Sequence, residues 1–564
     1  MSARFRSWML FSVIALFLGA FLLWPLAHVF RKALFDSNGF TVFYFKALVT
    51  DPLQIRAIGT SLFIAVMVTI GCVIVALPPA WLVARRTFPG KNMISALMLV
   101  PLILPPFVGA VGMKILFARS GSLSTLLMHM GIVSGPIDWL GQFPLVGIVV
   151  MEVMHLFPIL YLNLVAALAN IDPSLEEAAG NLGASPWRVF KRISLPLAGP
   201  GLFGGIVLVF IWSFTELGTP LVFGYRRVLP VMIYDSVSEV GTNPMGYAQV
   251  TLVLIISALG FWVSKYISGN RGNVATLGRL SVSTKEKALS LPGMLATYTL
   301  FGIVLFVATL PHISVILVSC GKRWFLTVLP EEFTLAFFGR ALSMELTQTA
   351  LFNSLFLSIC AATLDVFMGF SIAWLCVRSR IRGGDLLDTL AMLPLAVPGI
   401  VIAFGYLGCF SGHFPNTYLD PRFNPMLLLI ASYSIRRLPY IVRAIHAGLQ
   451  QVSSAYEDAA ANLGATPLRI IRRITLPLVA ANLLAGAILC FAFSMLEVAD
   501  SIILAQTERF YPITKAIYAL MDILENGVNV AAALGVWAMA LLGAAMLWAS
   551  CLLGKKMGQM FHAS

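Results

Sequence analysis

Long uncharged apolar runs, separated by short polar segments, recur along the whole chain. Because about 20 consecutive apolar residues can cross the hydrocarbon core of a bilayer as a helix, this pattern predicts an all-α membrane protein. The run at 8–30 follows Arg4 and Arg6, but it is too long for the apolar core of a signal peptide, so we interpret it as a retained first span. Twelve transmembrane helices are predicted, near residues 8–30, 58–84, 93–117, 144–168, 198–224, 247–267, 291–319, 350–377, 388–410, 426–447, 479–504 and 529–553.

The apolar pattern occurs twice in the chain. The stretch TSLFIAVMVTIG from Thr60 matches NSLFLSICAATL from Asn353, and VPLILPPFVGAVG from Val100 matches LPLAVPGIVIAFG from Leu393, in both cases 293 residues later. Six spans per half is an even number, so the halves share one orientation and are related by an axis along the membrane normal. The predicted domains are a first transmembrane domain at 1–267, a cytoplasmic linker at 268–290 and a second transmembrane domain at 291–564.

A polar segment is also repeated. EEAAGNLGASPWRVFKRISLPL begins at Glu176 and EDAAANLGATPLRIIRRITLPL begins at Glu457, with 14 of 22 positions identical. Acidic residues at the start of each copy complement a helix dipole, and Gly183 and Gly464 are placed to end that helix with a positive φ. The Ser-Pro or Thr-Pro dipeptide that follows starts a second helix. The pattern predicts a helix–turn–helix between the fourth and fifth spans of each half, and a simple connecting loop would not explain two retained copies.

Composition and charge place the repeated segment. The chain is 59% hydrophobic and 11% charged, whereas a soluble domain carries about 25% charged residues. Basic residues gather in short loops on one side, which the positive-inside rule assigns to the cytoplasm together with both termini. The net charge of +13 then needs no nucleic-acid partner. The basic residues are Arg4, Arg6, Arg85, Arg86, Lys91, Arg188, Lys191, Arg192, Arg378, Arg380, Arg382, Arg469, Arg472, Arg473, Lys555 and Lys556.

The chain offers no catalytic or metal-binding motif. Its seven cysteines lie in or beside apolar spans without metal-ligand spacing, so we interpret them as small core residues. The histidines are scattered and form no HExxH motif, which argues against a membrane enzyme. No G-x-x-x-x-G-K-[ST] phosphate loop occurs, so no cofactor is expected and ATP would have to be bound by a separate subunit.

The repeated segment resembles the signature loop of the permease subunits of binding-protein-dependent ABC importers, Glu-Ala-Ala-x3-Gly-x9-Ile-x-Leu-Pro. Asp458 stands where that family has glutamate. The resemblance implies a type I importer fold in which each six-helix half has its first span wrapped outside. It also implies that the two loops dock on two copies of a cytoplasmic ABC ATPase, and that a periplasmic binding protein supplies the substrate. The residues so assigned are Glu176, Glu177, Ala178, Ala179, Gly183 and Pro196, with Glu457, Asp458, Ala459, Ala460, Gly464 and Pro477 in the second half.

Polar residues inside spans are costly and usually functional. In SFTELGTPLVFG and SMLEVADSIILA, Glu216 matches Glu497 and Thr219 matches Asp500, with both acids of the second half on one helix face. These residues would line a central path for a cation, or serve as structural residues at the outer mouth or against a neighbouring helix.

The other ionisable residues in spans have no such match. Arg436 and Arg437 in the tenth span would attract an anion or, as we prefer, neutralise those acids. Glu152 and Asp365 have no partner in the repeat and are interpreted as packing or interface residues.

The substrate is the least determined property. A single chain with both halves fused resembles the iron(III), thiamine and aminoethylphosphonate branch of these permeases. The paired acids favour iron(III), whereas the arginines keep 2-aminoethylphosphonate or another anion open. A secondary transporter would also show repeats and intramembrane charges, but it would not need two such cytoplasmic loops.

Overall fold

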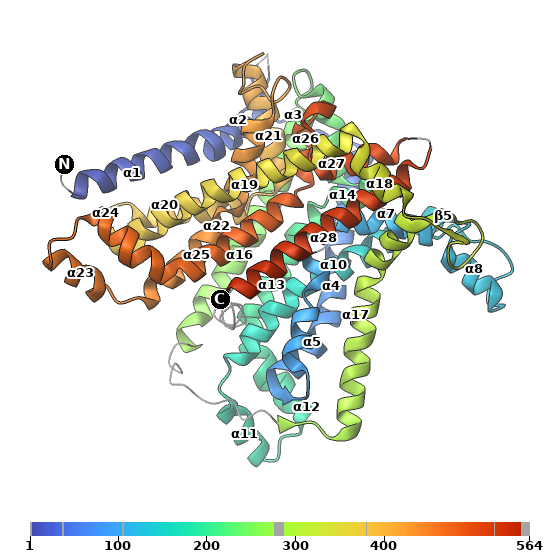
Figure 1. The fold of residues 1–564 in the computed structure, drawn as a ribbon, viewed down its shortest axis with the longest axis horizontal. Coiled ribbons are helices and arrows are strands. Elements are labelled where there is room, and N and C mark those ends of the chain that lie inside the picture. The colour runs from blue at the N-terminus through green and yellow to red at the C-terminus, as the bar shows by residue number, and fades with distance from the viewer. Residues whose placement is uncertain are drawn as a thin grey trace.

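The computed structural model describes residues 3–36, 39–103, 106–275, 287–379, 381–523 and 525–553, and Figure 1 shows their arrangement. Arg380, Lys555, Lys556 and residues 276–286 of the predicted linker lie outside the described residues. The helices of the first half are α1 (Ala3–Leu18), α2 (Trp24–Leu34), α3 (Phe43–Thr50), α4 (Pro52–Arg85), α5 (Lys91–Leu97), α6 (Val100–Ile103), α7 (Pro106–Leu116), α8 (Ser122–His129), α9 (Trp139–Gln142), α10 (Pro144–Ala169), α11 (Pro173–Asn181), α12 (Pro186–Val189), α13 (Leu195–Phe214), α14 (Gly218–Phe223), α15 (Leu229–Asp235) and α16 (Met245–Ala275). Those of the second half are α17 (Leu291–Cys320), α18 (Ala336–Ser343), α19 (Glu345–Trp374), α20 (Gly384–Met392), α21 (Gly399–His413), α22 (Met426–Gln451), α23 (Ala455–Asn462), α24 (Pro467–Ile470), α25 (Leu476–Met495), α26 (Ala499–Leu504), α27 (Ile513–Met521) and α28 (Gly527–Leu553).

Most of the predicted spans have a matching helix. Among the described residues, nine helices are long and apolar enough to cross a membrane, or up to eleven if two sharply bent pairs each count as one span. The bent pairs are the third span of each half, and the second of them, Gly384–Leu395 with Gly399–His413, bends by 101°. The tenth predicted span corresponds to α22, which carries three arginines and is not among the eleven. The all-α membrane fold is confirmed, and the number twelve stays a prediction.

Local sequence explains where many helices begin. Pro52, Pro144 and Pro173 each stand in the first turn of a helix, where the missing N–H costs nothing. The carboxylate of Asp51 accepts a hydrogen bond from the Leu53 N–H at 2.9 Å and so caps α4. These signals set the ends of the helices independently of tertiary packing.

The two halves pack their helices in the same way. Helix α10 lies against α4 and α13, and α22 lies against α19 and α25 in the second half. A Cβ on Gly205 would meet Leu160 at 2.6 Å, and a Cβ on Gly486 would meet Ile441 at 2.9 Å. The two glycines and their two neighbours are each 281 residues apart. The same close helix crossing, which needs a residue without a side chain, therefore occurs once in each half.

The first span of each half packs on the other half. Helix α2 lies along α21, and α17 lies along α7. A Cβ on Gly405 would meet Val29 at 3.2 Å, and a Cβ on Gly112 would meet the backbone nitrogen of Val315 at 2.5 Å. The family resemblance implies a first span outside its own half, and the structure shows that the opposite half receives it.

Three short strand pairs complete the fold. β1 (Phe35–Asp36) pairs with β2 (Gly39–Phe40), and β5 (Gly321–Arg323) pairs with β6 (Glu332–Phe333), both antiparallel. β3 (Arg86–Thr87) pairs in parallel with β4 (Lys287–Ala288), which ties the end of α4 to the start of the second half. The largest buried core runs through both halves, with Phe157 and Phe404 among its fully buried members.

Candidate functional site

The repeated polar segments form two surface loops, residues 172–196 and 453–477, which we call the first and second repeated loops. In the first, the Asp172 carboxylate accepts the Ser174 N–H at 2.9 Å, and the turn after α11 contains Gly183, whose φ is +82°. The Ser185 hydroxyl then accepts the Arg188 N–H at 3.4 Å at the start of α12. The predicted helix–turn–helix is confirmed, and Figure 1 shows α11–α12 and α23–α24 projecting at the bottom and left of the molecule.

The second repeated loop follows the same course. Ser453 Oγ accepts the Ala455 N–H at 3.3 Å, and Gly464 has a φ of +81°. Pro467 begins α24, where Thr466 takes the N-cap position without a side-chain bond. Both loops therefore depend on a left-handed glycine, as the sequence predicted.

An ion pair fastens the first repeated loop to α4. The Glu176 carboxylate accepts Arg85 Nη2 at 2.9 Å and Arg85 Nε at 3.1 Å, and it also accepts Ser194 Oγ at 2.6 Å. The two charged side chains are only 11% and 19% exposed. Glu176 therefore connects three segments: the end of the second span, α11 and the start of the fifth span.

The second repeated loop has the same fastening. Arg378 Nε lies 3.1 Å from Glu457 Oε2, and Thr475 Oγ1 donates to Glu457 Oε1 at 2.8 Å. Sequence reasoning assigned the two arginines only to the basic side of the membrane, although both follow the matched AWL stretches 293 residues apart. That match was the available signal for this contact.

Each loop exposes large apolar side chains. Leu182 and Leu463 occupy matched positions and are each 89% exposed, and Trp187 (68%) matches Leu468 (73%). Glu177, Asp458, Ala178 and Ala459 are exposed on the same loops, whereas Ala179 and Ala460 are half-buried. Pro196 and Pro477 stand in the first turn of α13 and α25. Sequence reasoning missed the two leucines, even though they are identical in both copies.

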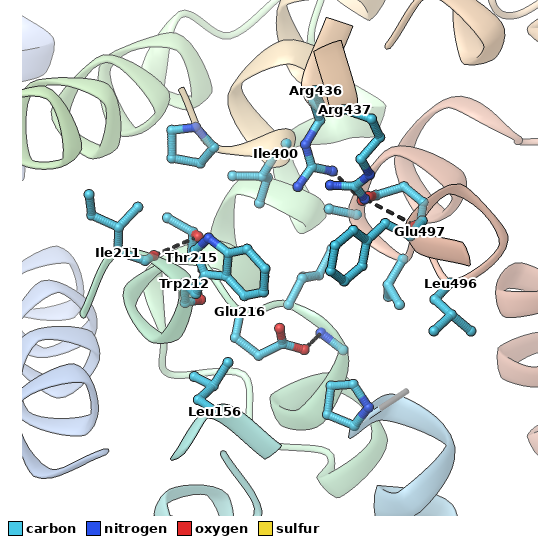
Figure 2. Close-up of a pocket in the computed structure, with 18 of the residues that line it drawn as sticks. Leu156, Ile211, Trp212, Thr215, Glu216, Ile400, Arg436, Arg437, Leu496 and Glu497 are labelled. Carbon is cyan, nitrogen blue, oxygen red and sulfur yellow. Dashed lines mark hydrogen bonds and ion pairs between the residues drawn. The ribbon is translucent and has the colours of Figure 1, made fainter. Parts of the chain in front are cut away.

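A central pocket lies between the halves (Figure 2). Its volume is ≈ 1150 Å³, open solvent at the mouth included. The lining contains residue pairs matched by the repeat, so the pocket sits on the pseudo-twofold axis. These pairs are Leu102 and Leu395, Pro106 and Gly399, His155 and Arg436, Leu156 and Arg437, Trp212 and Phe493, Thr215 and Leu496, Glu216 and Glu497, Leu217 and Val498, and Gly218 and Ala499.

The two matched glutamates lie where the fifth spans break. Helix α13 ends at Phe214 and α14 begins at Gly218, and α25 ends at Met495 before α26 begins at Ala499. The predicted common helix face for Glu497 and Asp500 is therefore wrong, because the helix is interrupted between them. Each break turns its glutamate into the pocket.

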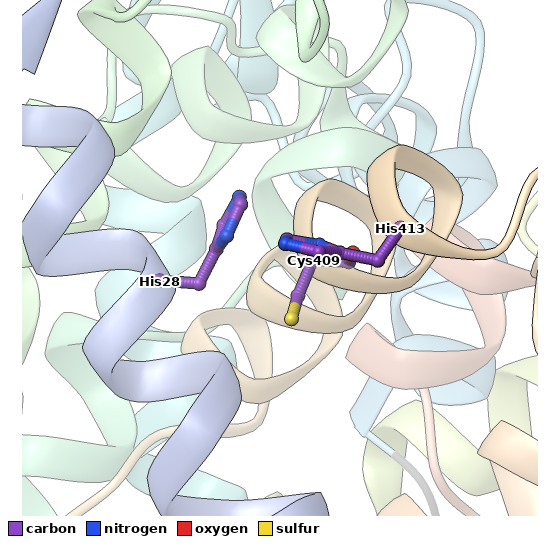
Figure 3. Close-up of side chains that lie close together, drawn as sticks. All are labelled: His28, Cys409 and His413. Carbon is purple, nitrogen blue, oxygen red and sulfur yellow. The ribbon is translucent and has the colours of Figure 1, made fainter.

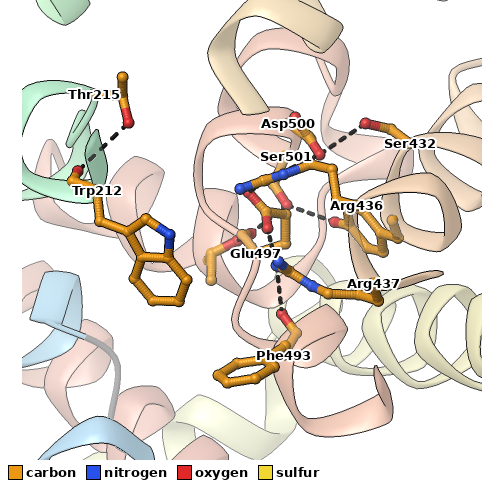
Figure 4. A network of polar contacts seen from close by, with 11 residues as sticks. Trp212, Thr215, Ser432, Arg436, Arg437, Phe493, Glu497, Asp500 and Ser501 are labelled. Atoms are coloured by element: carbon orange, nitrogen blue, oxygen red, sulfur yellow. Dashed lines mark hydrogen bonds and ion pairs between the residues drawn. The ribbon is translucent and has the colours of Figure 1, made fainter. Parts of the chain in front are cut away.

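The second half neutralises its own acids (Figure 4). Glu497 forms ion pairs with both Arg436 and Arg437, and Arg436 Nη1 also lies 3.3 Å from Asp500 Oδ2. Asp500 is fully buried behind the pocket lining and accepts Ser432 Oγ at 2.8 Å. The preferred prediction, that the arginines neutralise the acids, is confirmed for Glu497 and Asp500 but not for Glu216.

The first half has no such arginines. Glu216 Oε1 accepts the N–H groups of Gly218 at 3.0 Å and Thr219 at 3.3 Å. No ion-pair partner of Glu216 occurs in the described part of the chain, because His155 and Leu156 occupy the positions that match the arginines. The Thr219 side chain is fully buried and does not line the pocket.

The two acids without repeat partners sit between helices. Glu152 of α10 accepts a hydrogen bond from Ser213 of α13, and Asp365 of α19 accepts one from Ser434 of α22 at 2.6 Å. Both acids are buried. Each acid therefore joins two neighbouring helices, and its role as a packing or interface residue stays a prediction.

Comparisons with known proteins give a consistent picture. The model of the family described as binding-protein-dependent transport system inner membrane component matches residues 76–271 and again 365–559. The ferric transport system permease protein FbpB of Actinobacillus pleuropneumoniae is 27% identical over 513 residues, covering 88% of this chain and 71% of the relative. The Fe(3+)-transport system permease protein FbpB 2 of Haemophilus influenzae is 25% identical over 467 residues, which cover 82% of this chain and 83% of the relative. The molybdenum transport system permease protein ModB of the same species is 32% identical over 234 residues, which cover 40% of this chain and 100% of the relative.

Proposed function

The chain belongs to the family of binding-protein-dependent transport system inner membrane components, and from this premise we propose that it carries both membrane-spanning permease halves of an ABC importer. It moves a small substrate from a periplasmic binding protein to the cytoplasm and leaves ATP hydrolysis to separate subunits. The observation that carries the proposal is the pair of equivalent surface loops, each fastened to its half by the same Arg–Glu contact.

The repeated loops are proposed as the docking sites for two copies of a cytoplasmic ATPase. Each loop presents a leucine that is 89% exposed beside a second large apolar side chain. Exposed apolar side chains of this size, held on a capped helix–turn–helix, suit insertion into a cleft of a partner. Equivalent surfaces in the two halves match two identical partners, and this assignment places both loops and both termini in the cytoplasm.

The central pocket is proposed as part of the translocation path. It lies on the pseudo-twofold axis, and the breaks in the fifth spans give it polar backbone and carboxylate groups at membrane depth, where such groups are tolerated when they line a cavity. Alternating access then requires the two halves to move relative to each other, which ATPase closure would drive through Glu176 and Glu457.

Iron(III) is the proposed substrate. Two ferric permeases align along most of the chain, and Glu216 contributes a carboxylate without an arginine partner. Glu497 contributes less than the sequence suggested, because its charge is already balanced by Arg436 and Arg437.

An oxyanion is the second candidate substrate. Arg436 and Arg437 line the pocket, and the molybdenum permease is 32% identical over its full length. A phosphonate such as 2-aminoethylphosphonate has similar chemistry.

Two measurements test the proposal. When the affinity-tagged chain is purified from its own membranes, its ATPase partner should co-purify, so the sample should hydrolyse ATP. The double variant Leu182→Asp with Leu463→Asp should lose that co-purified activity, while the amount of chain in the membrane stays the same. Leu335→Asp is the control, because Leu335 is 73% exposed and lies outside both loops. ATP hydrolysis that stays with the double variant would contradict docking at these loops.

The substrate is tested by uptake of radiolabelled iron(III) and radiolabelled molybdate, measured side by side in cells with and without the chain. Iron uptake that depends on the chain supports the first candidate. Molybdate uptake that depends on it, with iron uptake unchanged, overturns iron(III) in favour of the oxyanion.

A further inference from the structure

Three potential metal ligands meet where the first span crosses the second half. His28 comes from α2, and Cys409 and His413 come from α21 (Figure 3). One ligand atom from each residue lies within 4.8 Å of the other two. His28 and Cys409 are buried and His413 is exposed, so the cluster has one side open to solvent.

The hydrogen bonds leave the ring nitrogens available for a metal. His413 Nδ1 lies 2.7 Å from the carbonyl oxygen of Cys409. A carbonyl only accepts, so Nδ1 carries the proton and Nε2 of the neutral ring presents a lone pair, the usual arrangement of a metal-bound histidine. His28 Nε2 is buried and has no hydrogen-bond partner among the residues that the structure describes. A buried nitrogen without a partner is costly unless another group, such as a metal ion, occupies its lone pair.

The pseudo-symmetric crossing shows that packing alone does not require these residues. At the crossing of α17 with α7, the position equivalent to Cys409 in the repeat is Leu116, and the position equivalent to His413 is Ser120. When Pro25 is aligned with Pro311, the position equivalent to His28 is Ser314. That crossing is even closer at its glycine, where a Cβ on Gly112 would meet the Val315 nitrogen at 2.5 Å. Among the residues that the structure describes, it nevertheless contains no group of three potential metal ligands. The three ligands are therefore an addition to one of two equivalent helix crossings.

We propose that His28, Cys409 and His413 bind a divalent transition-metal ion of the zinc class, separate from the transported substrate. Two imidazoles and a thiolate suit a borderline-soft ion, whereas hard iron(III) prefers oxygen ligands. Tetrahedral bonds of about 2.0–2.3 Å place ligand atoms roughly 3.3–3.8 Å apart, so small side-chain rotations from the present positions close the site.

The ion would join the first span to the opposite half. As the metal–sulfur bond forms, the Cys409 thiol releases its proton to solvent, and water takes the open fourth position on the His413 side. Arg31 and Lys32 lie one turn further along α2 and oppose a cation, but both are exposed and water screens their charge. The thiolate supplies a compensating negative charge at the site itself.

Cobalt(II) is the probe for this site. The full chain, purified in detergent and freed of metal with a chelator, should bind about one equivalent of Co²⁺, with the visible bands of tetrahedral coordination and a thiolate-to-cobalt charge-transfer band. Cys409→Ser should abolish the charge-transfer band, and His28→Gln or His413→Gln should weaken binding at least tenfold. Cys360→Ser is the control, because Cys360 is a half-buried thiol on α19, outside the cluster.

Thermal unfolding separates a lost site from a lost fold. Added Zn²⁺ should raise the melting temperature of the parent protein and of Cys360→Ser in a concentration-dependent way, because only the folded chain holds the site. Cys409→Ser should fold normally and show no such rise. A parent protein without the charge-transfer band, or an equal rise with Cys409→Ser, would overturn the proposal.

Discussion

Glu216 and Glu497 face the same pocket from matched positions, but only Glu497 is held by arginines. Arg436 and Arg437 both pair with Glu497, whereas the partners of Glu216 within the described part of the chain are backbone N–H groups of its own half. The repeat therefore conserves the acid and not its environment. Two identical side chains are expected to respond differently to the same substitution.

Replacing Glu497 should cost stability, whereas replacing Glu216 should not. Glu497→Gln leaves two largely buried arginines with Asp500 as the remaining acid, a loss of about 3 kcal/mol in the free energy of unfolding. Glu216→Gln keeps an oxygen that accepts from Gly218 and Thr219, so the loss should be at most about 1 kcal/mol. Thermal unfolding of both purified variants measures the difference.

Arg437, an ion-pair partner of Glu497, supplies the control. Arg437→Gln combined with Glu497→Gln removes one charge of each sign and should recover part of the lost stability, which a double-mutant cycle quantifies. If iron(III) passes through the pocket, Glu216→Gln should also reduce iron uptake. Equal destabilisation by the two single substitutions would show that the arginine pairing is not important in solution.

The Arg–Glu contacts should connect the repeated loops to the spans. Arg85→Ala with Arg378→Ala removes hydrogen bonds to charged groups that are mostly buried. The free energy that holds each loop against its half should fall by roughly 1.5–3 kcal/mol. We expect transport to fall while the chain still inserts in the membrane. The control is Arg443→Ala, whose partner contact with Asp388 is 3.4 Å and whose own side chain is 57% exposed, so its loss should cost at most about 1 kcal/mol. Transport in inverted membrane vesicles gives the comparison, and equal transport by the two variants would argue against a role for the contacts.

The left-handed glycines should be sensitive for backbone reasons alone. An added Cβ on Gly183 or Gly464 would meet nothing within 4 Å, so the cost of Gly183→Val with Gly464→Val is the strain at positive φ, about 1–2 kcal/mol for each residue. We expect loss of transport and of substrate-stimulated ATP hydrolysis, with normal membrane insertion. Gly180→Ala is the matched control, because Ala461 already occupies the equivalent position. Normal ATPase stimulation in the double valine variant would count against docking at these loops.

A buried lysine outside the membrane-crossing helices should make stability depend on pH. Lys515 of α27 donates to the carbonyl of Ile502 at 3.3 Å and lies 5.5–5.8 Å from the ring centroids of Tyr234, Tyr511 and Tyr518. Burial lowers the pKa of Lys515 to about 8, whereas an unfolded lysine titrates near 10.4. Between these values the unfolded chain holds more protons than the folded one.

The free energy of unfolding should therefore rise as the pH increases from about 8 to about 10.4. Lys515→Met removes the titrating group, so the difference in melting temperature between the parent protein and this variant should change across that window and stay level below pH 7. Unfolding in detergent across a pH series gives the difference. A constant difference from pH 7 to pH 10.5 would show that Lys515 titrates normally.

Much of the architecture was predictable because its signals are local. The apolar runs predicted the helical membrane fold, and the two copies of the repeated segment predicted both helix–turn–helix loops, including the positive φ at Gly183 and Gly464. The pocket residues Glu216 and Glu497 were found because the repeat aligns them. Sequence reasoning extended the fifth span through Asp500, because apolar runs do not reveal where a helix breaks.

The sequence by itself determined the two-fold repeat, the spans and the residues that stand at equivalent positions, because periodicity, caps and identity between copies are encoded within short stretches. Only the tertiary structure decided which residues meet. It paired Arg85 with Glu176 across 91 residues, carried the first span of each half onto the other half, and brought His28 to Cys409 and His413. Such contacts depend on how helices distant in sequence cross each other, and no local pattern of hydrophobic and polar residues specifies that crossing.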